Sequence, residues 1–340
     1  RLTDTVADVD VTADRTDGKR GSFAIRANFA RTDNILDLLV KLSEGEEGIA
    51  AKLLNLPGQP SVDLQVAGKG PLDDFATDVT VATEGRERLA GQITLGAQAP
   101  RRASDTPDRR IQADIGGDIT ALLAPRYRAF FGDDVRLTLD AVQEASGALA
   151  VDAFALTAQS AQVRGKLALN AESWPVLIDI DGQIASPDGT PVVLPAGGAG
   201  LSVDKADLKI AYDAAKGDAV KAVFDTAGLV TGGTTVRQSR IALDGTLQSA
   251  QGNLRAFGGD VTVEAAGIAL SDPALSEALG EQITGAAAVS YAEGQPTRVG
   301  GLTLTGTDYG LSGMAVVQGL AEGFATQLDM LLKADDLSRF

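Results

Sequence analysis

Apolar and polar residues alternate along most of the chain, which is typical of β-strands that have one dry face and one wet face. Val62, Leu64 and Val66, for example, are separated from one another by polar residues. The apolar positions that we assign to one common sheet face are Val62, Leu64, Val66, Val135, Leu137, Leu139, Leu167, Leu169, Ile178, Ile180, Leu208, Ile210, Ile241, Leu243, Val261 and Val263. Short segments of Gly, Asp and Ser separate the strands, so we expect antiparallel hairpins.

Only a few short segments have apolar residues at helical spacing. The candidate helices are Asp33–Leu42 with a further turn at Ile49–Leu54, Asp118–Phe131 broken at Pro125, and Asp272–Leu279. In the last of them, Asp272 is suited to the N-cap and Pro273 to the first helical position. A parallel sheet needs a helix between most strands, and this chain has too few. The predicted fold class is therefore all-β, an antiparallel sheet with few short helices.

A nine-residue pattern recurs at a long and regular spacing. A Thr is followed eight positions later by a Gly, and apolar residues stand two and four positions beyond that Gly. The copies are Thr83–Gly91, Thr157–Gly165 and Thr305–Gly313, which start 74 and 148 residues apart. A fixed long period in a strand-rich chain indicates a repeat array. We predict residues 1–33 to complete a preceding unit, followed by units at 34–117, 118–191, 192–266 and 267–340.

Charge and composition exclude several classes of function. The formal net charge of -16 repels a phosphate backbone, so nucleic acid is not expected as a partner. The chain contains no Cys and no His, which removes thiolate nucleophiles, His general bases and most transition-metal sites. We therefore expect neither an enzyme nor a bound cofactor or metal. The chain lacks an initial Met, a signal peptide and a run of 18 apolar residues, and we expect it to be a piece of a longer protein.

Local matches to chemical motifs have simpler interpretations. Ser202–Lys205 fits the Ser-x-x-Lys pattern of some hydrolases but stands beside a strand, without supporting motifs. Ala67–Gly70 resembles part of a phosphate loop, and we interpret its glycines as turn residues. Paired carboxylates can hold Ca²⁺ or act as acid and base, and two pairs occur on strands with apolar opposite faces, which favours a solvated face. These pairs are Asp8 with Asp10 and Asp179 with Asp181.

The aliphatic face has two interpretations. The pattern by itself favours two sheets packed on one another as a sandwich core. The alternative is a sheet curled into an open trough, whose aliphatic face stays available to lipid tails. Only 4% of the residues are aromatic, and small branched side chains leave room for acyl chains, which favours the trough.

Three segments resemble the repeats of TamB proteins from alphaproteobacteria. Leu53–Leu64 and Gly68–Phe75 fit the pattern L-P-G-x-P followed by G-x-G-P-L-x-x-F, and Glu87–Gly91 fits the strand ending E-R-L-x-G. Leu122–Gly132 has a similar character. The resemblance is clearest over residues 34–170, and its motifs mark strand corners and carry no catalytic residues.

The resemblance implies a periplasmic segment of a TamB/AsmA-like protein that is anchored in the inner membrane. It implies an elongated antiparallel sheet curled into an open hydrophobic groove, a β-taco, in which the sixteen face residues shield phospholipid acyl chains. Such proteins work with an outer-membrane barrel of the TamA type, through regions outside this chain. The implied function is phospholipid transfer between the two membranes, support of outer-membrane protein assembly, or both.

Two other classes of function stay open from the residues. The first is an acidic extracellular structural repeat protein of the adhesin type, with a closed core. The second is a carboxylate-based enzyme on a β-scaffold. Bound lipid favours the groove, calcium-dependent folding favours the adhesin, and a cleft with carboxyls of raised pKa favours the enzyme.

Overall fold

The computed structural model describes residues 6–101, 106–195, 200–249, 255–319 and 325–334. The structure is almost entirely β, with 66% strand and 7% helix. The described residues form 21 strands, and neighbouring strands run antiparallel. The predicted fold class is confirmed. The chain divides into two compact units, Arg1–Ser173 and Trp174–Phe340, and each is described by itself.

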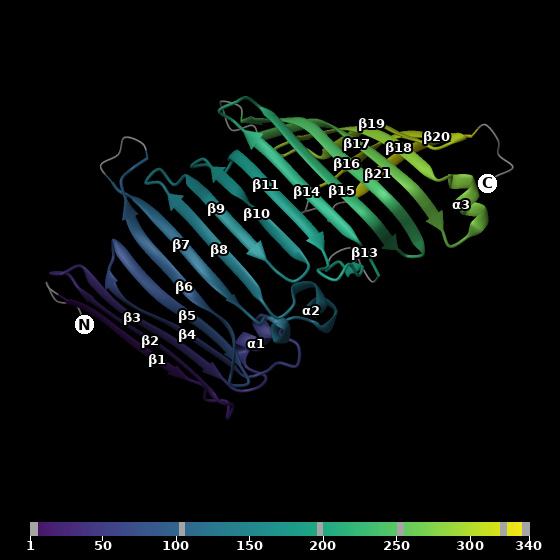
Figure 1. Ribbon diagram of the computed structural model, residues 1–340. Helices are drawn as coiled ribbons and strands as arrows, with labels where there is room; N and C mark the ends of the chain where they lie inside the picture. Colours follow the sequence, from purple (N-terminus) through teal and green to yellow (C-terminus); the bar gives the residue numbers. More distant parts are fainter. Residues whose placement is uncertain (1–5, 102–105, 196–199, 250–254, 320–324, 335–340) are drawn as a thin grey trace. The chain divides into compact units, whose positions relative to one another are not determined.

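The N-terminal unit is a meander in which each strand pairs with the next (Figure 1). Its strands are β1 Val6–Asp14, β2 Gly21–Ala30, β3 Ile35–Glu44, β4 Val62–Pro71, β5 Asp74–Thr83, β6 Arg86–Gln98, β7 Asp108–Gly117, β8 Val135–Gln143, β9 Leu149–Thr157 and β10 Ala161–Leu169. Alternating residues and short turns produce this order, because sequential strands joined by hairpins lie side by side.

The C-terminal unit is a second meander with one local exception. Strand β11 pairs with β14 and skips a small hairpin formed by β12 and β13. The strands are β11 Pro175–Ala185, β12 Val192–Val193, β13 Ser202–Val203, β14 Lys205–Asp213, β15 Ala219–Thr231, β16 Thr234–Ser249, β17 Arg255–Leu270, β18 Gln282–Ala292, β19 Thr297–Thr305, β20 Tyr309–Val317 and β21 Thr326–Ala334. From β14 to β21, consecutive strands pair.

Four insertions interrupt the meanders, and four long strands follow each of them in the chain. The insertions are α1 Ile49–Leu53, the pair η1 Thr120–Leu122 and α2 Pro125–Phe131, the β12–β13 hairpin, and α3 Pro273–Leu279. Within each unit the insertions lie at the same end of the strands. Successive strands run in opposite directions, and each insertion follows a strand that ends on this side of the sheet. The boundaries of the four repeat units predicted from the sequence stay a prediction.

The helix predicted for Asp33–Leu42 is wrong, because this segment enters strand β3. Strand β3 pairs with β2 on one side and β4 on the other. Apolar residues on both faces of this strand, such as Leu38 and Leu39, imitate helical spacing. Two partner strands satisfy the backbone hydrogen bonds of β3, and that tertiary pairing outweighs local spacing.

The other helix predictions are confirmed, and α3 begins as its sequence indicates. The side chain of Asp272 accepts hydrogen bonds from the backbone N–H groups of Ala274 at 2.9 Å and Leu275 at 3.2 Å. Pro273 is the first helical residue. Such N-cap contacts satisfy donors that the helix itself leaves unpaired.

Very little of the molecule is a closed core. One cluster of buried apolar residues joins α1 to the start of β4 and consists of Ala51, Leu56 and Val62, with Leu122 packed against it. The accessible surface is 20121 Å² for 34.9 kDa. Even two separate compact globules of half that mass would together expose only about 16,000 Å². Much apolar surface therefore stays accessible to solvent.

Candidate functional site

The predicted apolar positions of the N-terminal unit lie on one continuous face. Residues directly opposite each other on antiparallel strands point to the same side of the sheet. The register connects, strand by strand, Val66, Val79, Gly91, Ile115, Leu137, Leu156 and Val163. The face therefore includes all the predicted residues of β4, β8 and β10, namely Val62, Leu64, Val66, Val135, Leu137, Leu139, Leu167 and Leu169.

The C-terminal unit has an apolar face of the same construction. Its register connects Ile180, Ile210, Ala222, Leu243 and Val261 across strands β11 and β14 to β17. The predicted residues on this face are Ile178, Ile180, Leu208, Ile210, Ile241, Leu243, Val261 and Val263. Their role in binding lipid stays a prediction.

The side chains of the two apolar faces are mostly half-buried. Val62 and Val135 are buried, whereas Leu137 and Ile241 keep 40% and 41% of their surface exposed. In a sandwich, a facing sheet excludes water from nearly all such side chains. Within each unit, this exposure corresponds to an open trough and not to the sandwich that the pattern by itself favours.

Several strands contribute residues to the apolar faces that the sequence analysis did not assign. The main additions are Val9, Val11, Phe23, Ile25, Phe29, Leu36, Leu38, Val40 and Leu42 on β1 to β3, and Leu304 and Leu311 on β19 and β20. Leu328, Met330 and Leu332, whose alternation in the sequence predicts a shared face, lie on the same face of β21. Strand β3 was missed because we expected a helix there. The alternation in β2 is visible in the sequence and is the signal that identifies this strand.

A β-bulge keeps the apolar face intact at β8 and β9. Leu139 pairs with Phe154, whereas Ala141 pairs with Val151, so the register shifts between these two pairs. Phe154 and Val151 are three residues apart and share a face only because of this extra residue. Strict alternation along β9 places them on opposite faces, so the sequence pattern does not reveal this arrangement.

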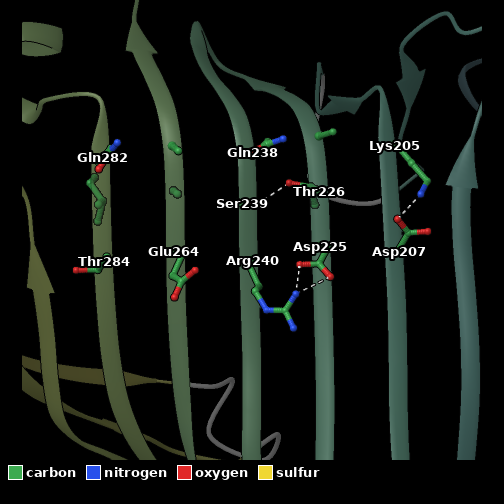
Figure 2. A pocket seen from close by; sticks show the side chains of 14 residues that line it. Lys205, Asp207, Asp225, Thr226, Gln238, Ser239, Arg240, Glu264, Gln282 and Thr284 are labelled. Carbon is green, nitrogen blue, oxygen red and sulfur yellow. Dashed lines mark hydrogen bonds and ion pairs between the residues drawn. The ribbon is translucent and has the colours of Figure 1, made fainter.

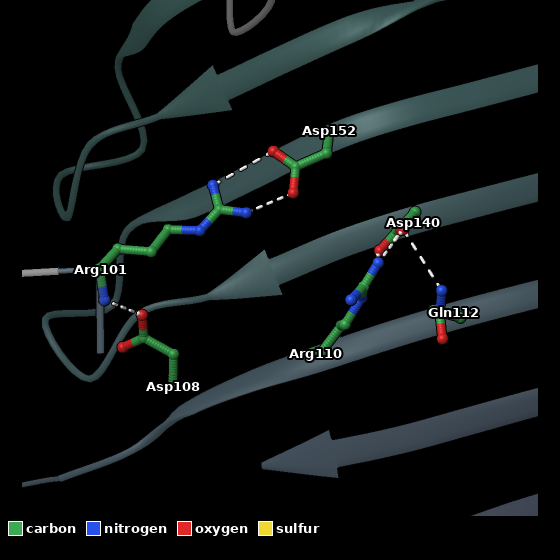
Figure 3. Close-up of polar contacts among 6 residues, drawn as sticks. All are labelled: Arg101, Asp108, Arg110, Gln112, Asp140 and Asp152. Carbon is green, nitrogen blue, oxygen red and sulfur yellow. Dashed lines mark hydrogen bonds and ion pairs between the residues drawn. The ribbon is translucent and has the colours of Figure 1, made fainter. Parts of the chain in front are cut away.

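The opposite face of the N-terminal unit carries ion pairs between neighbouring strands. Arg110 Nε donates to Asp140 at 2.9 Å, as Figure 3 shows, and Arg136 Nε donates to Asp114 at 2.8 Å. These hydrogen bonds hold the pKa of both carboxyl groups below their usual range. Because the pairs are largely exposed, each contributes little to stability, and this face remains polar and hydrated.

A polar hollow of about 520 Å³ lies on the corresponding face of the C-terminal unit (Figure 2). Arg240 Nη1 donates to both carboxylate oxygens of Asp225, at 3.0 and 3.2 Å. Lys205 Nζ lies 2.6 Å from Asp207. Ser202, which precedes Lys205 in a Ser-x-x-Lys pattern, lies on a different strand, β13. These charged groups neutralise one another and belong to the solvated face of the sheet.

The aspartate pairs singled out in the sequence also lie on the polar faces. Asp181 is 3.8 Å from Lys209, and Asp10 is 3.6 Å from Arg26. Each of these aspartates therefore faces a basic side chain on the neighbouring strand. Over the part of the chain that the structure describes, no group of three or more acidic side chains is arranged to hold a metal ion.

Comparison with known proteins identifies no relative of this chain, so the site is interpreted from its geometry. No known family model matches the chain, and neither does any curated protein. Among the described residues, none of the helices is long and apolar enough to cross a membrane.

Proposed function

We propose that this chain is a periplasmic segment of a lipid-conducting bridge of the TamB/AsmA type, which shields phospholipid acyl chains in a hydrophobic groove. The full-length protein would be anchored in the inner membrane and transfer phospholipid between the inner and outer membranes. Through regions outside this chain, it would work with an outer-membrane barrel of the TamA type and support outer-membrane protein assembly.

The observation that carries the proposal is the apolar face of each unit. In the N-terminal unit it continues across ten strands, with aliphatic residues opposite one another in register. Its side chains are half-buried, which is costly for a surface with no ligand, because exposed apolar area disfavours the folded state. Extended apolar patches on soluble proteins mark sites of interaction.

The energetics of such a face suit passive transfer. Removing one methylene group from water is worth about 0.8 kcal/mol, so a long acyl chain gains much by lying on the face. The ion pairs between neighbouring strands lie on the opposite face, and Glu44, a charged residue on the apolar side, is buried. An acyl chain therefore meets few polar groups along the face. An acyl chain on this surface is therefore free to slide across strands.

The first test is to extract the purified protein with organic solvent and to identify bound lipid by mass spectrometry. We expect phospholipid in extracts of the wild type. The Leu139→Arg substitution places a charge on the apolar face between Ala113 and Phe154, and a charge is costly where acyl chains must lie. We expect it to abolish lipid recovery. Thr138→Arg, on the opposite face of the same strand, is the matched control and should retain lipid.

Circular dichroism of each variant separates lost binding from lost folding. If Leu139→Arg unfolds the protein, Leu137→Arg replaces it, because Leu137 is 40% exposed and a long charged side chain there can reach water. A folded wild type that carries no lipid and takes none up from vesicles would overturn the proposed function.

A further inference from the structure

The apolar band of the N-terminal unit is long enough along its strands to hold the tails of one bilayer leaflet. On β2 it runs from Phe23 to Phe29, and on β3 from Leu36 to Leu42, in each case six residue steps. At roughly 3.3 Å per residue the band is about 20 Å wide along the strands. The hydrocarbon core of a membrane is about 30 Å thick, so the tails of one leaflet reach about 15 Å. A membrane-length acyl chain fits along the strands.

A partly open, mainly apolar cavity lies at one end of this band. Helix α1 contributes Ile49, Ala50 and Leu53 to this cavity of about 340 Å³, whose floor includes Phe23 and Leu42. The cavity is therefore an end compartment of the apolar face, lined mainly by groups that suit the methyl end of an acyl chain.

Three charged residues, Asp14, Arg15 and Glu44, also line this cavity. The Glu44 carboxylate is buried and accepts a hydrogen bond from the backbone N–H of Ala50 at 2.6 Å. Arg15 Nε donates to Asp17 at 3.0 Å. Acidic groups beside the cavity oppose a phosphate headgroup at this end.

The other end of the band is open and polar. Strands β2 and β3 are joined by residues 31–34, whose side chains are all exposed, and β4 and β5 by Leu72 and Asp73. No helix lies at this end between β2 and β5. A headgroup at these turns stays in water while its tails contact the apolar band.

We infer that a diacyl phospholipid binds the N-terminal unit with its tails parallel to the strands, the methyl ends in the cavity beneath α1 and the headgroup at the β2–β3 and β4–β5 turns. This inference rests on the proposed function and adds a defined lipid orientation and an end compartment for the tails.

The test uses two matched tryptophan probes on one strand. In a Trp174→Phe background, which removes the only native tryptophan, Phe23→Trp reports on the cavity end and Phe29→Trp on the turn end. Asn28→Trp, on the opposite face of the same strand, is the control. The probe ligand is phosphatidylcholine carrying a nitroxide either near its headgroup or near the methyl end of one acyl chain.

The expected result is a crossed pattern of fluorescence quenching. The methyl-end nitroxide should quench the Phe23→Trp variant several-fold more than the Phe29→Trp variant, and the headgroup-proximal nitroxide should do the reverse. The Asn28→Trp variant should be quenched by neither. Phe→Trp is a conservative change at both positions, and circular dichroism checks that each variant folds.

Each other outcome has a distinct meaning. The inverted pattern places the headgroup beside Arg15, whose Nη1 is buried and has no hydrogen-bond partner among the described residues. This result overturns the inferred orientation and keeps the proposed function. Equal quenching at both ends overturns the orientation as well. Absence of quenching at both ends, with folded variants, overturns the proposed function itself.

Discussion

The ring of Phe75 on β5 lies against Gly68 on the neighbouring strand β4. A Cβ atom added at Gly68 would lie 2.9 Å from the Cζ atom of Phe75 and 2.4 Å from the backbone oxygen of Ala76. Phe75 is only 3% exposed. Gly68 was expected at a turn, but it lies inside a strand, and that prediction is wrong. Its missing side chain makes the space that the Phe75 ring occupies.

We predict that Gly68→Val destabilises the N-terminal unit. The new side chain must displace both the Phe75 ring and the backbone of Ala76, and such overpacking costs about 1–3 kcal/mol. Chemical denaturation measures the loss. Gly300→Ala is the control, because Gly300 also lies in a strand but a Cβ there meets no atom within 4 Å. Equal stabilities of Gly68→Val and wild type would contradict the packing described here.

A second prediction concerns Asp108, which joins two loops and is 2% exposed. Its carboxylate accepts hydrogen bonds from the backbone N–H groups of Arg101 at 2.8 Å and Ala145 at 3.1 Å, and Figure 3 shows the first contact. Asp108→Ala leaves both donors unpaired and should cost about 1–3 kcal/mol. Thermal unfolding measures this cost, and Asp108→Asn, which retains one acceptor oxygen, should lose less. An alanine variant as stable as the wild type would show that the contacts are dispensable.

The third prediction is a pH dependence at the turn after β11. The Asp188 carboxylate accepts hydrogen bonds from the hydroxyl groups of Ser186 and Thr190, and these lower its pKa to about 2. An unperturbed aspartate has a pKa of about 3.9. Because the folded-state pKa is the lower one, the stabilisation is present above about pH 4 and is lost as the pH falls towards 2.

Carbon-13 NMR of the Asp188 carboxyl group measures its titration midpoint. Ser186→Ala and Thr190→Val should each raise the midpoint towards the unperturbed value. Ser202→Ala, away from this turn, should leave it unchanged. A wild-type midpoint near 4 would contradict the hydrogen-bonded turn.

The fourth prediction tests the repeat array. In a repeat array, each repeat unit is stabilised mainly by its own strands and by the neighbouring repeat units. Ending the chain after Leu270 should therefore leave β11 to β17 folded. This cut is placed at the end of β17, because the predicted boundary at residue 267 falls inside that strand. Hydrogen exchange should show unchanged protection in β14 and β15 and faster exchange in β17, which becomes an edge strand. Loss of protection throughout β14 and β15 would contradict the array.

Local signals in the sequence predicted many of the strands and most of the insertions. Period-two alternation identified the sixteen face residues, because the side chains of a strand point alternately to its two faces whatever its partners are. The start of α3 was equally readable, since the Asp272 cap and Pro273 act within one turn of the helix.

The sequence by itself determined the all-β class, the antiparallel hairpins and the apolar side of the strands that it identified, because these depend on neighbours in the chain. Only the tertiary structure decided that β3 is a strand, that Val151 and Phe154 share a face across a bulge, and that most described side chains of the apolar faces stay only half-buried. Those features depend on hydrogen bonds and packing between residues far apart in the chain, and alternation along one strand carries no information about its register with the next.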